Sequence, residues 1–489
     1  MKKRYSGALM HISSLGGDFG IGTLGREAYK FCDFLKESGF SAWQTLPINP
    51  QGPGFSPYNS ISSFAGNPLF VDPELLFEDG LITKDELRYA KSENIGRVDF
   101  KIVIPKNANI LRSAFSRFSD FDALERFCER EGEWISDYAS FMTIREELGG
   151  IAWQHFPREL RDKSDLASWR DKHKDIEDYY KFEQYIFSKQ WAKLRDYANG
   201  LGISLIGDVP IYVATDSCDV WSSPHIFNLS ESLAPIDVSG CPPDPFSEDG
   251  QLWGNPTYRW DILESEGFSW WISRLSRISS LFNTVRLDHF RAFEAYWSVP
   301  YGSRDARCGE WKKGPGKAFF DTVKKELPSL NMIAEDLGFL TEDVFKLRDE
   351  TGIPGMRVLQ FAFDGGEDNL YLPHMYTENS IAYTGTHDNE TLKGFIENSP
   401  ASRIDFMTRY LAPKNGESLA DAFLRASWSS VSAVAIAPIQ DFLALGNDAR
   451  MNTPSTVNER NWRFRLKNGV LTPELSKTLY ALNRENSRI

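Results

Sequence analysis

The chain has 489 residues, of which 41% are hydrophobic, and it is therefore long enough to bury a large core. Its formal net charge of −13 argues against nucleic acid or an anionic membrane surface as a partner, because both require clustered Lys and Arg side chains. A neutral ligand such as a sugar is compatible with this charge.

The five cysteines are scattered along the chain, and no two of them form a Cys-x-x-Cys pair. This spacing is not typical of a disulfide framework or a structural zinc site, and it favours a reducing cytosol. Residues 6–15 are interrupted by polar side chains and lack the continuous apolar run of a signal peptide. No apolar run of about 18 residues occurs either, so we predict a cytoplasmic protein without a membrane span.

The first part of the chain is rich in glycine and turn residues. Residues 42–47 have the pattern of a buried strand, and residues 49–54 supply turn chemistry directly after it. Ser56 and Tyr58 come next, and residues 64–71 form a second candidate strand. Because loops at strand ends commonly carry binding groups, this polar and aromatic loop is a candidate binding segment.

Two long segments are predicted to interrupt the strands. In residues 74–200 charges are dense and apolar residues recur every three or four positions, which predicts a mainly helical insertion. Residues 201–213 then form a strand that carries Asp208. Residues 214–262 show no strand or helix pattern, and irregular segments of this length are usually functional. We therefore expect residues 214–262 to be a loop-rich insertion that covers the active-site cleft.

From residue 267 onward, predicted helices and strands alternate, which is typical of units built around a parallel sheet. The candidate strands lie near residues 42, 69, 205, 285, 333, 358, 382 and 434. Eight strands can close a barrel, and the residues after the last strand are too few for a typical β-sandwich. We therefore predict the α/β class, with residues 1–489 forming a single catalytic (β/α)8 TIM-type barrel unit that has a helical insertion, long loop insertions and no C-terminal β-sandwich domain.

Three of the predicted strands end in carboxylates, as the catalytic residues of such barrels do. Asp288 lies two residues after Arg286, so both side chains point to one face, and the guanidinium should lower the pKa of the carboxylate. Glu335 lies between an apolar run and Asp336, and both neighbours should raise the pKa of Glu335. Asp388 follows a third strand.

This trio fits retaining cleavage of a glycosidic bond, which requires a nucleophilic carboxylate and a carboxylic acid about 5–5.5 Å apart. Asp288 fits the ionised nucleophile and Glu335 the general acid. Asp388 could steady the transition state through sugar hydroxyls, and His387 could donate to the same sugar. For any single acid an ion pair or a helix N-cap is an equal alternative, whereas three at separate strand ends favour a catalytic site.

Metal and phosphate sites lack a clear signature in this sequence. The adjacent Asp and His residues at 288–289 and at 387–388 would point to opposite faces of a strand, which does not favour a shared metal. Residues 314–317 lack the full P-loop pattern, and no Gly-x-Ser-x-Gly elbow is present. We therefore predict neither a metal site nor a cofactor.

Several motifs occur in order over most of the chain. They are Ser56-Pro-Tyr58, Gly207-Asp208, Pro242-Pro-Asp244, Gly250-Gln-Leu-Trp-Gly-Asn-Pro256, Arg286-Leu-Asp288-His-Phe-Arg, Ala334-Glu-Asp-Leu-Gly338, Gly385-Thr-His-Asp-Asn389 and Ala449-Arg-Met-Asn452. The acid motifs alone would indicate the wider α-amylase superfamily. With the more specific Ser-Pro-Tyr and Gly-Gln-Leu-Trp-Gly-Asn-Pro stretches, the chain resembles the amylomaltases, which are 4-α-glucanotransferases or disproportionating enzymes.

The resemblance implies a (β/α)8 barrel and retaining transfer of α-1,4-glucan segments through a covalent glycosyl-aspartate, without metal or organic cofactor. Malto-oligosaccharides and α-1,4-glucans would be donors, and glucose or malto-oligosaccharides acceptors. At matching positions it makes Asp288 the nucleophile, Glu335 the acid/base and Asp388 the stabilising group. The residues that would hold the glucan or cover the cleft are Ser56, Tyr58, Asp208, Gln251, Trp253, Arg286, Asp336 and His387.

Two positions depart from the family pattern, and two other functions stay open. Gly16 stands where the family usually has Pro, and Ser455 stands where Gly is common, which leaves the role of Asn461 open. An α-glucan hydrolase would use the same acids with water as the acceptor, so the 240–256 loop is the discriminating feature. A catalytically silent glucan-binding protein would be expected to lose one of the three acids, and this chain keeps all three.

Overall fold

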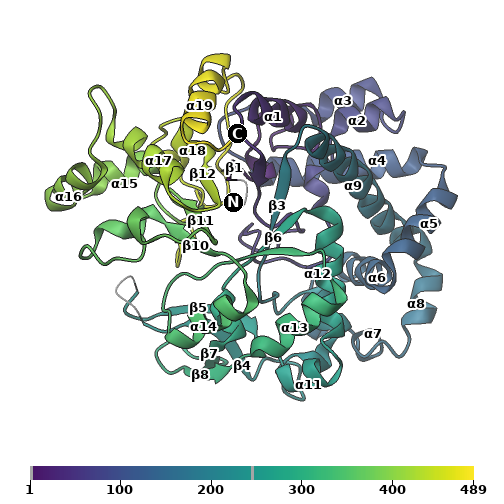
Figure 1. Ribbon diagram of the computed structural model, residues 1–489. Coiled ribbons are helices and arrows are strands. Elements are labelled where there is room, and N and C mark those ends of the chain that lie inside the picture. Colours follow the sequence, from purple (N-terminus) through teal and green to yellow (C-terminus); the bar gives the residue numbers. More distant parts are fainter. Residues whose placement is uncertain (1–3, 244–246) are drawn as a thin grey trace.

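Eight parallel strands close into a barrel at the centre of the molecule (Figure 1). The computed structural model describes residues 4–243 and 247–489. The barrel strands are β1 (Tyr5–Leu9), β2 (Ala42–Gln44), β3 (Ser204–Val209), β6 (Thr284–Leu287), β9 (Asn331–Ala334), β10 (Gly355–Val358), β11 (Ser380–Tyr383) and β12 (Val434–Pro438). Their order around the barrel is β1-β12-β11-β10-β9-β6-β3-β2, which confirms the predicted (β/α)8 TIM-type fold.

The predicted strand near residue 69 is wrong, and the barrel strand that replaces it is β1. Residues 68–70 form a short 3-10 helix, because Pro68 cannot donate to a ladder and the Asn67 side chain accepts from the backbone N–H of Leu69. β1 was missed because it contains Gly7, a residue that strands disfavour. A Cβ at Gly7 would lie 2.6 Å from the carbonyl oxygen of Ala42, so close packing against β2 requires glycine there.

Helices cover the outside of the barrel in the expected alternation. They include α1 (Arg26–Glu37), α12 (Ser269–Leu281), α13 (Gly316–Glu326), α14 (Glu342–Thr351), α15 (Leu392–Asn398), α16 (Ala401–Leu411) and α17 (Leu419–Ser429). In α1 the buried residues recur every three or four positions, which is the pattern of a helix with one face on a core. α14 begins after Thr341, whose side chain makes no capping hydrogen bond, and Glu342 and Asp343 lie in its first turn.

The stretch between β2 and β3 is helical and lies to one side of the barrel (Figure 1). It contains α2 (Pro73–Glu78), α3 (Lys84–Ala90), α4 (Phe100–Arg117), α5 (Phe121–Glu131), α6 (Glu133–Glu147), α7 (Arg158–Arg161), α8 (Leu166–Lys172) and α9 (Lys174–Gly200). α9 packs against α1 and α12, and the indole N–H of Trp191 donates to the carbonyl of Leu281 at 3.0 Å. α9 therefore also covers the barrel, and the division at residues 74–200 stays a prediction.

A four-stranded antiparallel sheet of order β5-β4-β7-β8 lies below the barrel in Figure 1. Its strands are β4 (Asp237–Cys241), β5 (Gln251–Pro256), β7 (Ala295–Pro300) and β8 (Glu310–Lys313). Residues 214–262, which are expected to be mostly loop, thus contain β4 and β5 together with α10 (Cys218–Ser222) and the start of α11 (Trp260–Ser265). The partner strand β7 follows β6 in the chain, and such distant pairing leaves no local sequence pattern. Asp244 lies outside the described residues.

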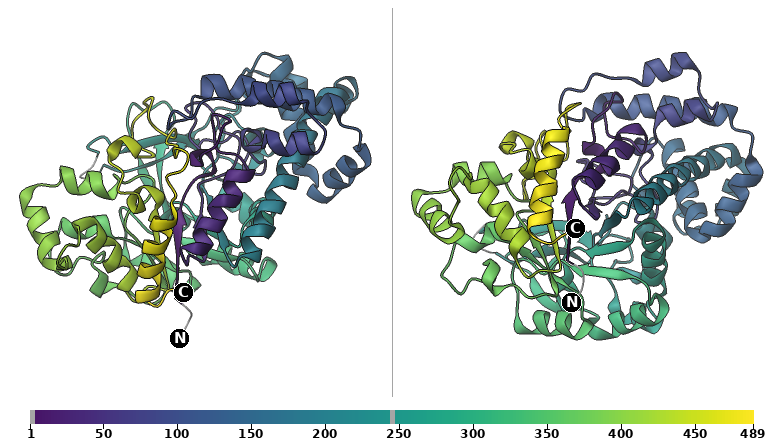
Figure 2. Two further views of the ribbon diagram at one scale, coloured as in Figure 1. Left: turned by 90° about the horizontal axis from the view of Figure 1, so that it is seen from above. Right: turned by 45° about the horizontal axis from the view of Figure 1, so that its top comes forward.

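Residues 439–489, all of them described, contain α18 (Ile439–Phe442) and α19 (Pro473–Glu485) and no strand. The prediction that no β-sandwich follows the barrel is thus confirmed. α19 packs beside α1 (Figure 2), and Nη1 of Arg488 donates to the carbonyl of Tyr5 at 3.0 Å, so the end of the chain lies against β1. Among the described residues, no helix combines the length and the apolar character needed to cross a membrane.

Candidate active site

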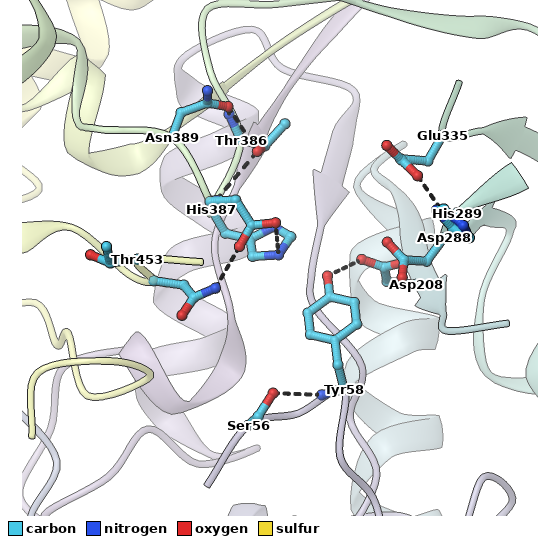
Figure 3. A network of polar contacts seen from close by, with 12 residues as sticks. Ser56, Tyr58, Asp208, Asp288, His289, Glu335, Thr386, His387, Asn389 and Thr453 are labelled. Carbon is cyan, nitrogen blue, oxygen red and sulfur yellow. Dashed lines mark hydrogen bonds and ion pairs between the residues drawn. The ribbon is translucent and has the colours of Figure 1, made fainter. Parts of the chain in front are cut away.

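The carboxyl ends of three neighbouring barrel strands bring Asp208, Asp288 and Glu335 together. β6 pairs in parallel with β3 and with β9, with Arg286 opposite Asp208 and Leu287 opposite Ala334. The residues that follow β6 and β9 therefore lie side by side at one end of the barrel. Figure 3 shows the carboxyl groups of Asp288 and Glu335 on the same side of the site, with Asp208 beside them.

Arg286 connects two of these acids. Its Nη1 donates to both oxygens of Asp208 at 2.7 Å and to Oδ1 of Asp288 at 2.9 Å. The hydroxyl of Tyr58 donates to Oδ2 of Asp208 at 2.6 Å. The same-face placement of Arg286 and Asp288 that the sequence predicts is therefore observed, and Asp208 anchors both Arg286 and Tyr58 next to Asp288.

The predicted direction of the Asp288 pKa is wrong. Burial of the carboxyl group and the negative charges of Asp208 and Asp388 raise the pKa of Asp288 to about 7, although Arg286 acts in the opposite direction. Arg286 does not offset the burial of Asp288, because its positive charge is shared between two carboxylates. The local sequence shows that Arg286 is a neighbour of Asp288, but it does not show Asp208 on β3 or Asp388 after β11.

Glu335 has the environment that a proton donor needs. Its Oε2 accepts a hydrogen bond from the backbone N–H of His289 at 2.7 Å. Burial and the charge of Asp288 raise the pKa of Glu335 well above its ordinary value, despite the opposing effects of Arg286 and this N–H. Because the charge of Asp288 acts on Glu335, the first proton taken up belongs to the pair. The predicted rise in the Glu335 pKa agrees with the structure.

His289 links the acids to the neighbouring sheet. Its backbone has φ 53° and ψ 49°, a left-handed conformation that is costly for a residue other than glycine and is often found at functional sites. This turn aims the His289 N–H at Glu335 and places the imidazole edge-on to Trp253, with ring centroids 4.8 Å apart. Burial lowers the pKa of His289 to about 3, so the ring is neutral at physiological pH.

Asp388 lies on the facing wall, after β11. Its Oδ1 accepts from Nδ2 of Asn452 at 2.6 Å, and its Oδ2 lies 3.3 Å from Nε2 of His387. Nη2 of Arg450 donates to the backbone carbonyl of Asp388 at 2.6 Å. These contacts fix the carboxylate while its side chain stays partly exposed. Figure 3 shows His387 across the site from the Asp288 and Glu335 pair.

An aromatic contact joins the two walls. The rings of Tyr58 and His387 are stacked, with centroids 5.2 Å apart and planes 11° apart. The backbone N–H of Tyr58 donates to Oγ of Ser56 at 3.2 Å, so Ser56 supports the turn that carries Tyr58. Burial lowers the pKa of His387, which keeps this imidazole neutral. Tyr58 therefore contacts Asp208 on one wall and His387 on the other, as Figure 3 shows.

Gln251 and Trp253 lie on β5 and not in an irregular loop. The indole N–H of Trp253 donates to Oε1 of Gln251 at 3.1 Å. Trp253 keeps 36% of its surface exposed, so its indole is not part of a buried core. Through its contact with His289, the residue after Asp288, the indole reaches the site from the second sheet.

Asp336 does not face the site. Its side chain is 0% exposed, its Oδ2 accepts from Nη1 of Arg348 at 2.5 Å, and its Oδ1 accepts from the backbone N–H of Met356 at 2.6 Å. It also lies 3.5 Å from Nη1 of Arg357. The structure therefore does not support the predicted contact of Asp336 with the glucan, because its oxygens join α14 and β10 to the end of β9.

Asn452 and Arg450 are the residues that sequence reasoning missed. Both belong to the Ala449-Arg-Met-Asn452 motif, whose sequence alone does not indicate a contact with Asp388. Asn461 closes the following loop, since its Oδ1 accepts from the N–H of Thr453 at 3.1 Å and its Nδ2 donates to the carbonyl of Thr456 at 3.1 Å. Asn461 thus holds the segment that follows Asn452.

Within residues 4–243 and 247–489, no group of three or more His, Cys, Asp and Glu side chains is arranged to hold a metal ion. The acids of the site are instead engaged by Arg286, Asn452 and a backbone N–H. That the protein works without a cofactor stays a prediction.

Comparison with known proteins identifies the family. The family model described as 4-alpha-glucanotransferase matches residues 10–472. The chain is 44% identical to a 4-alpha-glucanotransferase of Clostridium butyricum, over 97% of this chain and 99% of that protein, and 43% identical to one of Thermus thermophilus, over 99% of each. The structure of an amylomaltase from Streptococcus agalactiae in complex with acarbose is 39% identical, with a TM-score of 0.96 over 99% of this chain and 100% of that one. The chain therefore belongs to the 4-alpha-glucanotransferase family of enzymes.

Proposed function

We propose that this enzyme transfers α-1,4-glucan segments between malto-oligosaccharides by a retaining double displacement through a covalent glycosyl-Asp288 intermediate. The observation that carries the proposal is the pair formed by Asp288 and Glu335. The two carboxyls follow adjacent strands, burial raises the pKa of each, and Arg286 donates a hydrogen bond to Asp288 while Glu335 accepts one only from a backbone N–H. One ionised and one protonated carboxyl is the state that retaining cleavage requires.

In the first step, an oxygen of Asp288 attacks the anomeric carbon of the donor as its bond to the leaving oxygen breaks. Glu335 gives its proton to that oxygen, and the shortened glucan leaves with a free hydroxyl. In the second step, the Glu335 carboxylate takes the proton of an acceptor hydroxyl, whose oxygen attacks the same carbon and releases Asp288. Two inversions at one carbon give retention, and Glu335 ends protonated as it began.

The remaining residues of the site have binding roles in this proposal. Asp388, fixed by Asn452, accepts hydrogen bonds from the hydroxyls of the donor sugar as positive charge develops on its ring. His387 is neutral and can both donate to and accept from the same sugar. Tyr58 and Arg286, both anchored on Asp208, complete the pocket of the donor sugar.

Trp253 and Gln251 cover the reacting centre from β5. The indole contacts His289 next to Asp288, and therefore reduces the access of water to the glycosyl-enzyme. A sugar acceptor can still bind, because its apolar face packs against the indole. This arrangement favours transfer over hydrolysis.

The donors in this proposal are malto-oligosaccharides and α-1,4-glucans, and the acceptors are glucose or malto-oligosaccharides. Residues 1–489 act as one catalytic barrel unit, with residues 74–200 as a helical insertion and residues 214–262 as the segment that covers the cleft. The cysteine pattern supports the cytoplasm as the compartment.

Incubation with maltotriose alone tests the proposed reaction. Transfer produces glucose together with maltotetraose and longer oligosaccharides, without a rise in the total number of reducing ends. Hydrolysis produces glucose and maltose and raises that number with every turnover. A product pattern of the second kind would replace the proposal with an α-glucan hydrolase.

A further inference from the structure

Two exposed aromatic rings stack on each other beside the catalytic strand ends. Trp311 on β8 is 38% exposed and Phe339, in the loop after β9, is 60% exposed. Their ring centroids lie 6.1 Å apart with planes 23° apart. Single exposed apolar side chains are common, whereas a stacked pair of large rings at the surface indicates a contact with something outside the protein.

Both rings are connected to the acid pair by short stretches of chain. Phe339 lies four residues after Glu335, so their Cα atoms are at most about 14 Å apart. The guanidinium of Arg291, three residues after Asp288, lies over the ring of Trp311 at 3.7 Å from the centroid and 5.9 Å from that of Phe339. Short stretches of chain therefore connect the aromatic pair to both acids, and Phe339 follows Glu335 in the loop after β9.

Trp311 is held in one orientation. Arg291 covers one face of its ring, and Trp297, its cross-strand partner on β7, packs edge-on at 5.1 Å. The indole N–H of Trp297 donates in turn to the carbonyl of Ala306 at 2.8 Å. A ring fixed in this way loses little side-chain entropy when a ligand binds to its free surface.

Burying the cationic side chain of Arg291 against an aromatic ring costs free energy of folding. The residue is buried, and its Nε and Nη1 have no hydrogen-bond partner among the described residues. The carboxylate of Glu294 lies 3.9 Å away, which leaves the ring of Trp311 as the main contact of this cation. An apolar side chain would support Trp311 at lower cost. The cost therefore favours a function for the orientation of Trp311.

We infer that Trp311 and Phe339 form a subsite for the α-1,4-glucan chain that accepts the transferred segment. This inference rests on the proposed function. Glu335 protonates the leaving oxygen and later activates the acceptor hydroxyl, so a surface next to Glu335 contacts the leaving or accepting chain and not the sugar bonded to Asp288. The C–H face of a glucose unit is apolar and weakly positive, and it packs on the negative face of an aromatic ring.

The Phe339→Ala variant tests the subsite, because the ring is mostly exposed and its loss leaves the core intact. We expect KM for maltoheptaose to rise roughly three- to tenfold, while KM for maltotriose changes less than twofold and kcat is unchanged for both. Phe339→Trp should restore the parent KM for maltoheptaose. Tyr301→Ala removes a comparably exposed ring (58%) at the end of β7 and serves as the matched control.

Binding without turnover gives an independent readout. In a Glu335→Gln background, calorimetry should show that Phe339→Ala weakens maltoheptaose binding by the same factor and leaves maltotriose binding nearly unchanged. The subsite would be overturned if Phe339→Ala weakened the binding of both sugars equally or of neither. It would also be overturned if Tyr301→Ala weakened maltoheptaose binding to the same extent. A change in self-association without a change in length dependence would also overturn it and indicate a protein contact. Failure of the parent enzyme to rearrange maltotriose would instead contradict the proposed function.

Discussion

At the scale of single residues, the site depends on environments that several distant strands create together. The identity of the three acids could be predicted because each follows an apolar run in the sequence. The raised pKa of Asp288 could not be predicted, since Asp208 and Asp388 come from other parts of the chain. The burial of Asp336 could not be predicted either, because its partners Arg348 and Met356 belong to later elements.

The pH dependence of kcat/KM follows from these pKa directions. Asp288 must be ionised to attack, so activity of the free enzyme should fall as the pH decreases through about 7, well above the range of an ordinary aspartate. Glu335 must be protonated, so activity should also fall at a pH above its raised pKa. The pH–rate profile with maltotriose measures both limbs. An acid limb near pH 4 would show that Arg286 dominates the pKa of Asp288.

Because burial raises the pKa of Glu335, ionisation of this carboxyl group destabilises the folded protein. A carboxyl whose pKa is raised on folding stabilises the protein most at low pH, and this stability is lost as the pH rises through the folded-state pKa. The Glu335→Gln variant should therefore gain Tm relative to the parent at pH 9 and not at pH 5. The exposed Glu378→Gln substitution is the control, and the same Tm difference at both pH values would contradict this explanation.

Ser455 is a strained residue in the loop that Asn461 closes. Its φ of 59° lies in the left-handed region, which glycine adopts far more readily than serine. Ser455→Gly should therefore raise the free energy of unfolding by about 1 kcal/mol. Chemical denaturation measures the change, and Ser329→Gly, at an exposed turn without positive φ, should lower the same quantity.

At the scale of elements, the sequence predicts a strand or helix that has its own hydrophobic pattern. It does not predict strands that form only because a distant part of the chain pairs with them. Seven of the eight barrel strands were located from apolar runs, whereas β1 was missed because close packing requires Gly7 within it. β4 and β5 were missed because they complete a sheet with β7 and β8, which follow β6. The segment expected to be a loop is thus a sheet edge that holds Trp253 at a defined distance from His289.

Removal of the indole tests what β5 contributes. Trp253→Ala should increase the fraction of glucan lost to water more than it lowers the rate of donor cleavage, because the glycosyl-enzyme becomes more accessible. The loss of contact with the sugar should cost roughly 1–3 kcal/mol of acceptor binding. The measurement is the ratio of new reducing ends to rearranged oligosaccharides.

Leu252→Ala is the matched control for this prediction. Leu252 is the preceding residue of the same strand, is exposed, and points to the opposite face of the sheet. It should keep the parent ratio. If Trp253→Ala also keeps that ratio and only lowers Tm, the indole has a structural role and no part in excluding water.

At the scale of the whole molecule, the barrel determines where chemistry can occur. Alternating elements predicted a parallel barrel, and the barrel in turn places the residues after β3, β6 and β9 at one end. The extent of the second sheet depends on tertiary packing, and so does the position of the helices between β2 and β3. The composition of these two regions indicates only that they differ from the barrel.

A chelation experiment addresses the molecule as a whole. We expect transfer between malto-oligosaccharides to be unchanged after exhaustive dialysis against EDTA, because the proposed mechanism uses the acids of this chain alone. Recovery of lost activity by one added divalent ion, and not by others, would show that a metal takes part.

The central claim is that Asp288 becomes covalently bonded to the donor sugar. In Glu335→Gln, an α-maltosyl fluoride donor carries a leaving group that needs no acid, while the second step lacks its base, so the glycosyl-enzyme should accumulate. Mass spectrometry of the acid-quenched protein should then show one added maltosyl group, located by peptide mapping on Asp288 and absent in the Asp288→Asn, Glu335→Gln double variant. Steady consumption of the fluoride without any adduct, or an adduct on another residue, would contradict the account.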